Sequence, residues 1–389
     1  MNKNIFLPLL CSILFLSFFL QAYSLYIGYH LKFFMIMIPL SYIMINNSLY
    51  LDSKLYLHEK LLLITIISFS STTLYSYNIS SSLRMVFGLL ILIILYWMLI
   101  STLKAISKNI ILRTLLYAGI IFNISSILLY LTGLIISNGD FTQRAIIYGL
   151  MIERNTPRLI GTMTDPNFFS AYNNIFIFLS IFYYKKISIS KPLLLLAIIN
   201  TLLTFSIGGY IALFFGSVGL IFHTKNKLKF LFNTVSIICI TLLTVYIFFP
   251  QYIEQVQHKV MVSLDGSGRF KDWGSALMTF YDNPFGIGIF TFLEYNGHFY
   301  AGTHYTHNTY LDVLVEGGII TFLFYMLFLL SFLRKSYSNS NVFLFPVTIA
   351  ILISFLSLSA FLNEYWLLIL ALLHRLSSCE LNEKTLNSN

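Results

Sequence analysis

The chain has 389 residues, of which 57% are hydrophobic and 10% are charged, and its mean hydropathy is +0.79. Soluble domains carry about 25% charged residues, so a water-soluble globular fold is excluded. The net charge of +9 does not indicate a nucleic-acid partner, because the Lys and Arg residues are scattered in loops without a dense basic face. Cys11, Cys239 and Cys379 lie far apart and indicate neither a disulfide framework nor a metal site.

Apolar segments separated by short polar stretches run along the whole chain. About 20 apolar residues are needed for a helix to cross a hydrocarbon core, and twelve segments approach that length. The predicted spans are 5–21, 31–46, 60–77, 83–103, 114–136, 167–184, 191–206, 208–223, 230–249, 312–333, 342–358 and 360–374. The first is interpreted as a retained span, because no small-residue cleavage site follows it. Uniformly apolar runs satisfy their backbone groups as helices, so we predict an all-α integral membrane protein with about 12 transmembrane helices.

The basic residues predict the orientation of these spans. If the N-terminus is cytoplasmic, every inside loop contains Lys or Arg, as the positive-inside rule requires. These loop residues are Lys54 and Lys60, then Lys104, Lys108 and Arg113, then Lys185, Lys186 and Lys191, then Lys225, Lys227 and Lys229, then Arg334 and Lys335. Both termini are therefore predicted in the cytoplasm, and two larger loops are predicted on the outer face.

The spans and loops divide the chain into five predicted regions. They are an N-terminal transmembrane bundle (1–136), a first extracytoplasmic loop (137–166), central transmembrane helices (167–249), a large extracytoplasmic loop (250–311), and C-terminal transmembrane helices with a cytoplasmic tail (312–389). Most acidic residues lie in the two outer loops, so chemistry is expected there. The spans hold few ionisable groups and the halves show no repeat, which weakens a transporter interpretation without removing it.

The first outer loop leads into a predicted helix start. Asp165 is of the type that caps free amides, and Pro166 fits the first helical position. A helix N-terminus carries partial positive charge, and Arg144, Arg154 and Arg158 are close in sequence. Together these groups could hold a diphosphate at the headgroup level. The alternative stays open that Asp165-Pro166 is an ordinary cap and the arginines are interfacial anchors.

The second outer loop predicts a short amphipathic helix that begins at the N-cap Ser267. Large apolar residues recur at helical spacing, at Phe270, Trp273, Leu277 and Phe280 or Tyr281. We therefore expect this helix to lie against the membrane surface. Asn283-Pro284 ends it, and Gly286 and Gly288 allow a loop that could present amides to a ligand or form an ordinary turn.

Three histidines follow, His298, His304 and His307. His304 and His307 are three residues apart, which could place both imidazoles on one helical face and raises the question of a metal. No carboxylate or cysteine completes a recognisable set such as HExxH, so no metal site is predicted. Such histidines can be interfacial anchors, but the adjacent Asn308 and the membrane-buried Glu316 favour a functional role.

Four short motifs occur in order in the region 158–330. They are G-T-M-T-D-P-N at 161–167, S-G-R at 267–269 with Trp273, N-P-F-G-I-G at 283–288, and H-N-T-Y-L followed by V-E-G-G between 307 and 318. This order and spacing resemble the O-antigen polymerase and O-antigen ligase superfamily of bacterial envelope polysaccharide enzymes. The chain departs from many relatives at 205–209, where Ile207 replaces the arginine of a Ser-Arg-Gly motif. The phosphate contact commonly assigned to that arginine must be absent or supplied by Arg158, Arg154 or Arg269.

The resemblance implies transfer of a glycan from undecaprenyl diphosphate to a sugar hydroxyl, at the periplasmic face of a bacterial plasma membrane and without a cofactor. Implied partners are the lipid-linked oligosaccharide, membrane lipid, and a chain-length regulator and flippase of the same pathway. His307 is the expected base, with His304 second, while Asn308 and Glu316 would orient the imidazole or the acceptor. The expected substrate-binding residues are Arg158, Arg269, Asp165, Asn167, Arg154, Asn308 and Trp273.

Three functions stay open at this point. A polymerase would transfer the growing chain to an incoming repeat unit, and it is favoured on the abundant Ile, Asn, Lys and Tyr of the chain rather than on a catalytic residue. A ligase would transfer the glycan to lipid A core. A lipid-linked oligosaccharide flippase would need a polar cavity between helices, whereas polarity here is concentrated in the outer loops.

Overall fold

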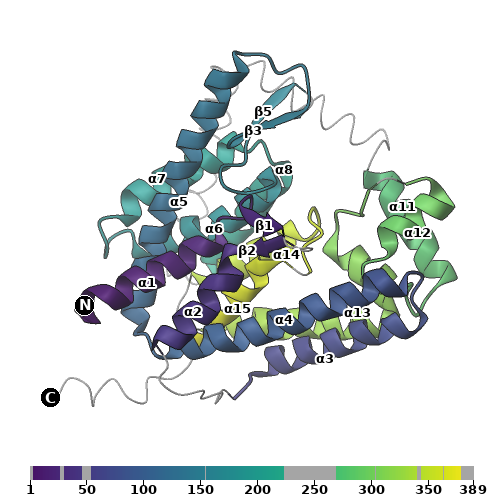
Figure 1. Cartoon of the computed structure of the whole chain (residues 1–389). Helices are drawn as coiled ribbons and strands as arrows, with labels where there is room; N and C mark the ends of the chain where they lie inside the picture. Colours follow the sequence, from purple (N-terminus) through teal and green to yellow (C-terminus); the bar gives the residue numbers. More distant parts are fainter. Residues whose placement is uncertain are drawn as a thin grey trace.

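The computed structural model describes residues 3–26, 30–45, 54–153, 155–222, 269–302, 304–339, 343–361 and 363–377, most of them in helices (Figure 1). The helices are α1 (Lys3–Phe18), α2 (Phe33–Ile45), α3 (Leu57–Ser71), η1 (Thr72–Tyr75), α4 (Ile79–Lys104), α5 (Lys108–Ser137), α6 (Pro166–Tyr183), α7 (Ser190–Leu203), α8 (Ile207–Ile221), α11 (Arg269–Asp282), α12 (Phe292–Tyr300), α13 (Thr309–Tyr337), α14 (Leu344–Ser354) and α15 (Glu364–Ser377).

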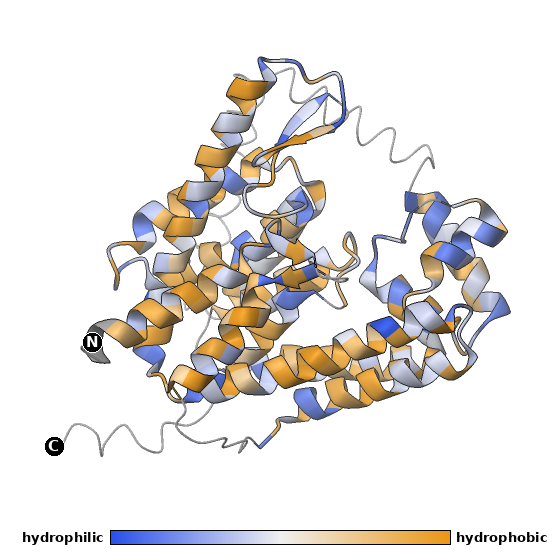
Figure 2. Cartoon of the chain, in the orientation of Figure 1, coloured by the Kyte–Doolittle hydropathy of each residue, from blue (hydrophilic) through white to orange (hydrophobic). Residues whose placement is uncertain are grey.

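Eleven of the twelve predicted spans coincide with one of these helices, and the remaining one, 230–249, lies outside the described residues. Within the described ranges, α4, α5 and α13 are long and apolar enough to cross a membrane, and α1, α2, α7, α8 and α14 are shorter apolar helices. Hydrophobic residues cover the helices on their outer as well as their inner sides (Figure 2). The helical membrane class therefore holds, and the count of twelve crossings stays a prediction.

The first outer loop contains a small sheet that the sequence analysis did not predict. Strands β3 (Ala145–Ile147), β4 (Leu150–Glu153) and β5 (Thr156–Leu159) pair antiparallel in the order β3-β4-β5. A second hairpin joins β1 (Ser24–Tyr26) to β2 (His30–Lys32) ahead of α2. Leu150 and Leu159 are fully buried and the strands contact α5, so the three-stranded sheet packs against the helices instead of forming an open loop.

An aromatic core fixes the start of α6 against α1 and α5. Phe19, Phe122, Phe169 and Phe176 are buried and their rings meet at centroid distances of 4.9–5.8 Å. A Cβ on Gly119 of α5 would lie 2.5 Å from the Phe176 ring, so this close approach requires glycine. The first turn of α6 is therefore held rigidly.

The loop 283–288 and the kink in α13 form one unit. Gly318 has φ +72° and interrupts the helical geometry of α13. The loop pairs with the backbone around this kink through Ile287 N to Val315 O (3.1 Å), Gly288 N to Glu316 O (3.1 Å) and Ile319 N to Pro284 O (2.9 Å). A side chain at Gly318 would collide with the backbone of Phe285. Two motifs that looked separate in the sequence thus depend on each other.

Candidate active site

The N-terminal ends of α6, α8, α13 and α15 lie close together. Ser206 caps α8 and donates its Oγ to Asn167 Oδ1 in the first turn of α6 (2.6 Å). Thr309 at the start of α13 bonds the segment that leads to α15, through Thr309 N to Phe355 O (2.9 Å) and Ala360 N to Thr309 Oγ1 (3.0 Å). Each helix N-terminus carries partial positive charge, so their convergence favours an anion.

The cap predicted at Asp165 is present. One carboxylate oxygen of Asp165 accepts hydrogen bonds from Asn167 N (2.7 Å) and Phe168 N (3.3 Å), and Pro166 occupies the first helical position. The Asn167 side chain faces Ser206, so the segment 205–209 lies directly beside the T-D-P-N motif. Ile207, which replaces the family arginine, is half-buried at the start of α8. The cationic contribution at this position is therefore missing.

Arg158 is buried and already paired. Its Nη1 donates to Glu153 Oε2 (2.7 Å), and its Nε donates to Thr204 O (3.0 Å) in the turn between α7 and α8. This arginine ties the three-stranded sheet to the turn that presents Ser206. The remaining N–H groups of Arg158 could reach a ligand only from this buried position. Arg154 lies outside the described residues.

The loop that carries His307 is held by its neighbours on both sides. Trp273 Nε1 of α11 donates to Thr306 O (2.8 Å), which fastens the loop to α11. The buried Thr306 Oγ1 lies 2.7 Å from Asp312 Oδ1 and accepts a bond from Asn308 N (3.0 Å). Asn308 in turn caps α13 by accepting from the amides of residues 310 and 311. These bonds hold His307 in a left-handed conformation with φ +50°, which non-glycine residues seldom adopt.

His307 lies within electrostatic reach of residues from separate motifs. Its side chain is exposed, and its pKa lies below the ordinary 6.5 because partial desolvation and the positive charge of Arg269 disfavour the imidazolium. His304 also lowers the pKa of His307, whereas the carboxylates of Asp165 and Asp272 raise it. The imidazole is therefore neutral at pH 7 and able to accept a proton. Asp165, Arg269 and His304 thus each lie within electrostatic range of the His307 imidazole.

Glu316 bonds a different part of the chain from the His307 loop. It is buried in α13, where its carboxylate accepts bonds from Phe290 N (2.9 Å) and Phe292 N (3.0 Å). These contacts stabilise the turn after the G-I-G motif, in which Phe290 has φ +63°. The expected role of Glu316 in orienting the imidazole or the acceptor stays a prediction.

Several polar residues near the site were not found from the sequence. Thr306 and Asp312 hold the His307 loop, and their signal would have been a hydroxyl directly before the histidine and an Asp in the first turn of the next helix. Lys32 pairs with both oxygens of Glu364 at the start of α15 (2.9 Å each), a contact between residues 332 positions apart. No local pattern reveals such a pair.

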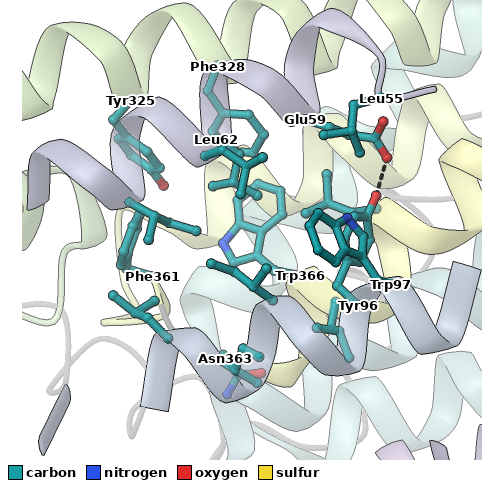
Figure 3. A pocket seen from close by; sticks show the side chains of 17 residues that line it. Leu55, Glu59, Leu62, Tyr96, Trp97, Tyr325, Phe328, Phe361, Asn363 and Trp366 are labelled. Carbon is teal, nitrogen blue, oxygen red and sulfur yellow. Dashed lines mark hydrogen bonds between the residues drawn. The ribbon is translucent and has the colours of Figure 1, made fainter. Parts of the chain in front are cut away.

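A pocket lies between α3, α4, α13 and α15 (Figure 3). Its cavity volume is about 80 Å³, and its walls are almost entirely aliphatic and aromatic. At one end Tyr96 Oη donates to Glu59 (Figure 3). Tyr325 Oη in the wall is buried and has no partner among the described residues. The lining fits an uncharged chain better than a charged group.

No group of three or more His, Cys, Asp or Glu side chains placed to hold a metal ion occurs in the described part of the chain. The expectation of a metal-free site stays a prediction.

The comparisons with known proteins agree with the motifs. The family model of O-antigen ligases matches residues 192–326, about a third of the chain, which include α7, α8, α11, α12 and more than half of α13. This match confirms the resemblance to the O-antigen polymerase and ligase superfamily and does not distinguish the two activities. Searches of curated proteins and of solved structures each found no match.

Proposed function

We propose that this protein of the O-antigen polymerase and ligase superfamily transfers a glycan from undecaprenyl diphosphate to a sugar hydroxyl at the outer face of the plasma membrane, and that it polymerises repeat units. One observation carries the proposal. Asp165 and Arg269 come from two other motifs and each lies within electrostatic reach of His307, beside the N-termini of α6 and α13.

The bound donor diphosphate is a dianion and gains further negative charge as it leaves with the electron pair of the broken bond, so its binding site must offset negative charge. The N-terminus of α13 offers partial positive charge, and Arg269 offers a forked guanidinium. Arg158 adds a buried positive charge behind the turn that presents Ser206, although Glu153 offsets much of it. We assign Arg269 to direct contact with the diphosphate and Arg158 to the support of that site, with Arg154 a further candidate.

The transfer itself needs one proton acceptor. The acceptor hydroxyl oxygen forms a bond to the anomeric carbon, while the bond from that carbon to the diphosphate oxygen breaks and the diphosphate leaves with the electron pair. The hydroxyl proton passes to the neutral imidazole of His307. The bonds from Thr306 to Asp312 and from Trp273 to Thr306 hold the loop that carries His307. Asn167, Asn308 and His304 are candidates for contacts with the sugars.

The apolar pocket supports a polyprenyl-linked donor (Figure 3). Its walls come from α13 and α15, which both begin beside the site, and from α3 and α4. An uncharged chain of the donor could occupy this pocket while the diphosphate stays at the helix ends.

The ligase is the second candidate, because the matching family model is that of O-antigen ligases. The test uses purified enzyme with undecaprenyl-diphosphate repeat units. A ladder of products supports the polymerase, product only after addition of lipid A core supports the ligase, and no product in either assay overturns the transfer reaction. Expected partners in the cell are the chain-length regulator and the flippase of the pathway.

Because arginine and helix ends are proposed to offset the leaving charge, the reaction should not need a divalent ion. Product formation by the purified enzyme should therefore survive excess chelator. Complete loss that one added metal restores would make the histidines ligands rather than bases.

A further inference from the structure

Helix α11 exposes its apolar residues and buries its small and polar ones. The buried residues are Asp272, Ser275, Ala276 and Thr279. The exposed ones are Phe270, Leu277, Met278 and Tyr281, and the exposed fractions of Met278 and Tyr281 are 62% and 86%. An amphipathic helix on a water-exposed surface has the opposite arrangement.

The rotation of α11 about its own axis is fixed, so these residues are not free to turn inward. Trp273 donates to Thr306 O, and Asn283 Nδ2 just after the helix donates to Tyr295 Oη of α12 (3.1 Å). Ala276 packs in a closed cluster with Ile287, Phe292 and Val315. The interior face of α11 is therefore filled, and its apolar face is left uncovered by the described residues.

The exposed apolar surface continues beyond α11. Phe285 is 64% exposed, and its carbonyl accepts a bond from Tyr75 Oη (2.8 Å) at the outer end of α3. Leu74 beside it is 86% exposed. We call the seven residues of this surface the α11 rim: Phe270, Leu277, Met278, Tyr281, Phe285, Leu74 and Tyr75.

We propose that the α11 rim is a membrane-binding surface that inserts into the interface of the outer leaflet. The α11 rim continues through η1 onto the apolar side of α3, on which Ile67 is exposed. We expect that side of α3 to face lipid. The α11 rim combines aromatic and aliphatic side chains with the exposed Lys271, a composition typical of interfacial segments. A shallow open groove between α11 and Tyr300 of α12 is lined by Leu277, Met278 and Tyr281 of the rim, with Asp282 at the end of the helix, and offers space for lipid chains.

The structure also changes the expected contact surface. From the sequence, Trp273 and either Phe280 or Tyr281 were expected on the membrane-facing side. Tyr281 is exposed, but Trp273 and Phe280 are half-buried and Trp273 holds the His307 loop. Insertion of the remaining residues would hold Arg269, the first residue of α11, at the level of lipid headgroups. This consequence rests on the proposed function, because a lipid-linked diphosphate lies at that level.

The test measures contact with lipid directly. Met278→Cys, in a chain whose native cysteines are replaced, is labelled with an environment-sensitive fluorophore and placed in nanodiscs of phosphatidylethanolamine and phosphatidylglycerol. Brominated acyl chains should quench the label at position 278 strongly and leave Gly297→Cys unquenched. Gly297 is exposed on α12 and a side chain there meets no obstacle, so it is the matched control. Ile67→Cys on α3 is the positive control.

Equal quenching at 278 and 297, or none at 278 while 67 is quenched, would overturn the proposal. A label at 278 that is shielded without being quenched by brominated lipid would indicate a protein partner or a second copy instead, and would also overturn it.

A second measurement links the rim to turnover. Met278→Glu combined with Tyr281→Glu should abolish the lipid quenching of a label at position 277 and raise the KM for the lipid-linked donor on the order of tenfold, because charge replaces buried apolar area. Met278→Leu with Tyr281→Phe should leave both unchanged. An unaltered KM in the Glu variant would refute the link to the substrate. Failure of the wild-type enzyme to turn over any donor would refute the proposed function and leave the quenching result standing.

Discussion

The cluster around Glu59 and the cluster around His307 each combine a carboxylate, a histidine and aromatic residues, yet their polar groups are used differently. In the first cluster Glu59 Oε1 forms hydrogen bonds with His374 Nδ1 (2.7 Å) and Tyr96 Oη. Its other oxygen, Oε2, accepts a hydrogen bond from Tyr56 N (2.6 Å). Glu59 and His374 are buried, and the contacts join α3, α4 and α15. This network is closed by groups of the chain itself.

The cluster around His307 lies at the opposite ends of α13 and α15 and is exposed at the surface. Arg269, His304 and His307 have exposed side chains, and the backbone bonds of Thr306 and Asn308 stabilise their surroundings without covering the imidazole. A satisfied buried network stabilises one packing of the helices, whereas exposed groups on a rigid loop can bind a ligand. Substitutions in the Glu59 cluster should therefore lower stability, whereas substitutions of His307 and Arg269 should lower activity.

The largest expected effect is on stability, at Glu59. Glu59→Ala leaves His374 and Tyr96 buried without their partner and should lower the free energy of unfolding by about 3–5 kcal/mol. Thermal unfolding in detergent measures this loss. Glu294→Ala is the matched control, since this carboxylate is exposed and bonds Asn78 and Ser81 at the surface. Equal unfolding temperatures of Glu59→Ala and Glu294→Ala would show that the Glu59 network does not stabilise the fold as expected.

The next effect is on activity, at His307. His307→Ala removes the proposed base and should lower the rate about a hundredfold or more, with lipid-linked single repeats accumulating in cells. The unfolding temperature should stay near that of wild type. His298→Ala removes an exposed histidine bonded to Tyr77 and should retain activity. Normal polymer length and amount in the His307→Ala strain would remove this residue from the mechanism.

The two arginines should respond differently to substitution. Arg269→Lys keeps the charge but loses the forked donor, so kcat/KM should fall roughly tenfold or more while the protein stays folded. Arg158→Lys breaks the bonds to Glu153 and Thr204, so it should lower the unfolding temperature as well as activity. Protein amount in the membrane is measured alongside. Wild-type polymer from both Arg158→Ala and Arg269→Ala would exclude the arginines from the site.

The smallest effect is a displacement of the pH profile. The pKa of His307 is lowered by desolvation and by Arg269, so the neutral base is fully present at neutral pH and is lost as the pH falls through that lowered pKa. Arg269→Gln removes the cation, which raises the pKa and should move the acid limb of kcat to higher pH. If the acid limb of kcat lies at the same pH in Arg269→Gln as in wild type, even at a lower maximal rate, the His307 imidazole does not determine that limb.

Local patterns were enough for much of the helical architecture. Eleven predicted spans coincide with helices because apolar runs and short polar breaks are local properties of the chain. The same holds for the cap at Asp165, where Asp-Pro encodes a helix start in adjacent residues. The motif at 283–288 was identified, but its pairing with the α13 kink was not, because that pairing joins backbone atoms about thirty residues apart.

The sequence by itself determined the membrane class, the helix positions and the residue types that could bind a diphosphate, because each depends on composition and spacing of near neighbours. Only the tertiary structure decided which of those residues meet. Arg158 pairs with Glu153 on the neighbouring strand of a sheet that lies in a predicted loop. Glu316 bonds the backbone of residues 290 and 292, and the large apolar residues of α11 face outward. These outcomes follow from competition between distant partners for the same hydrogen bonds and the same interior space, which no local pattern records.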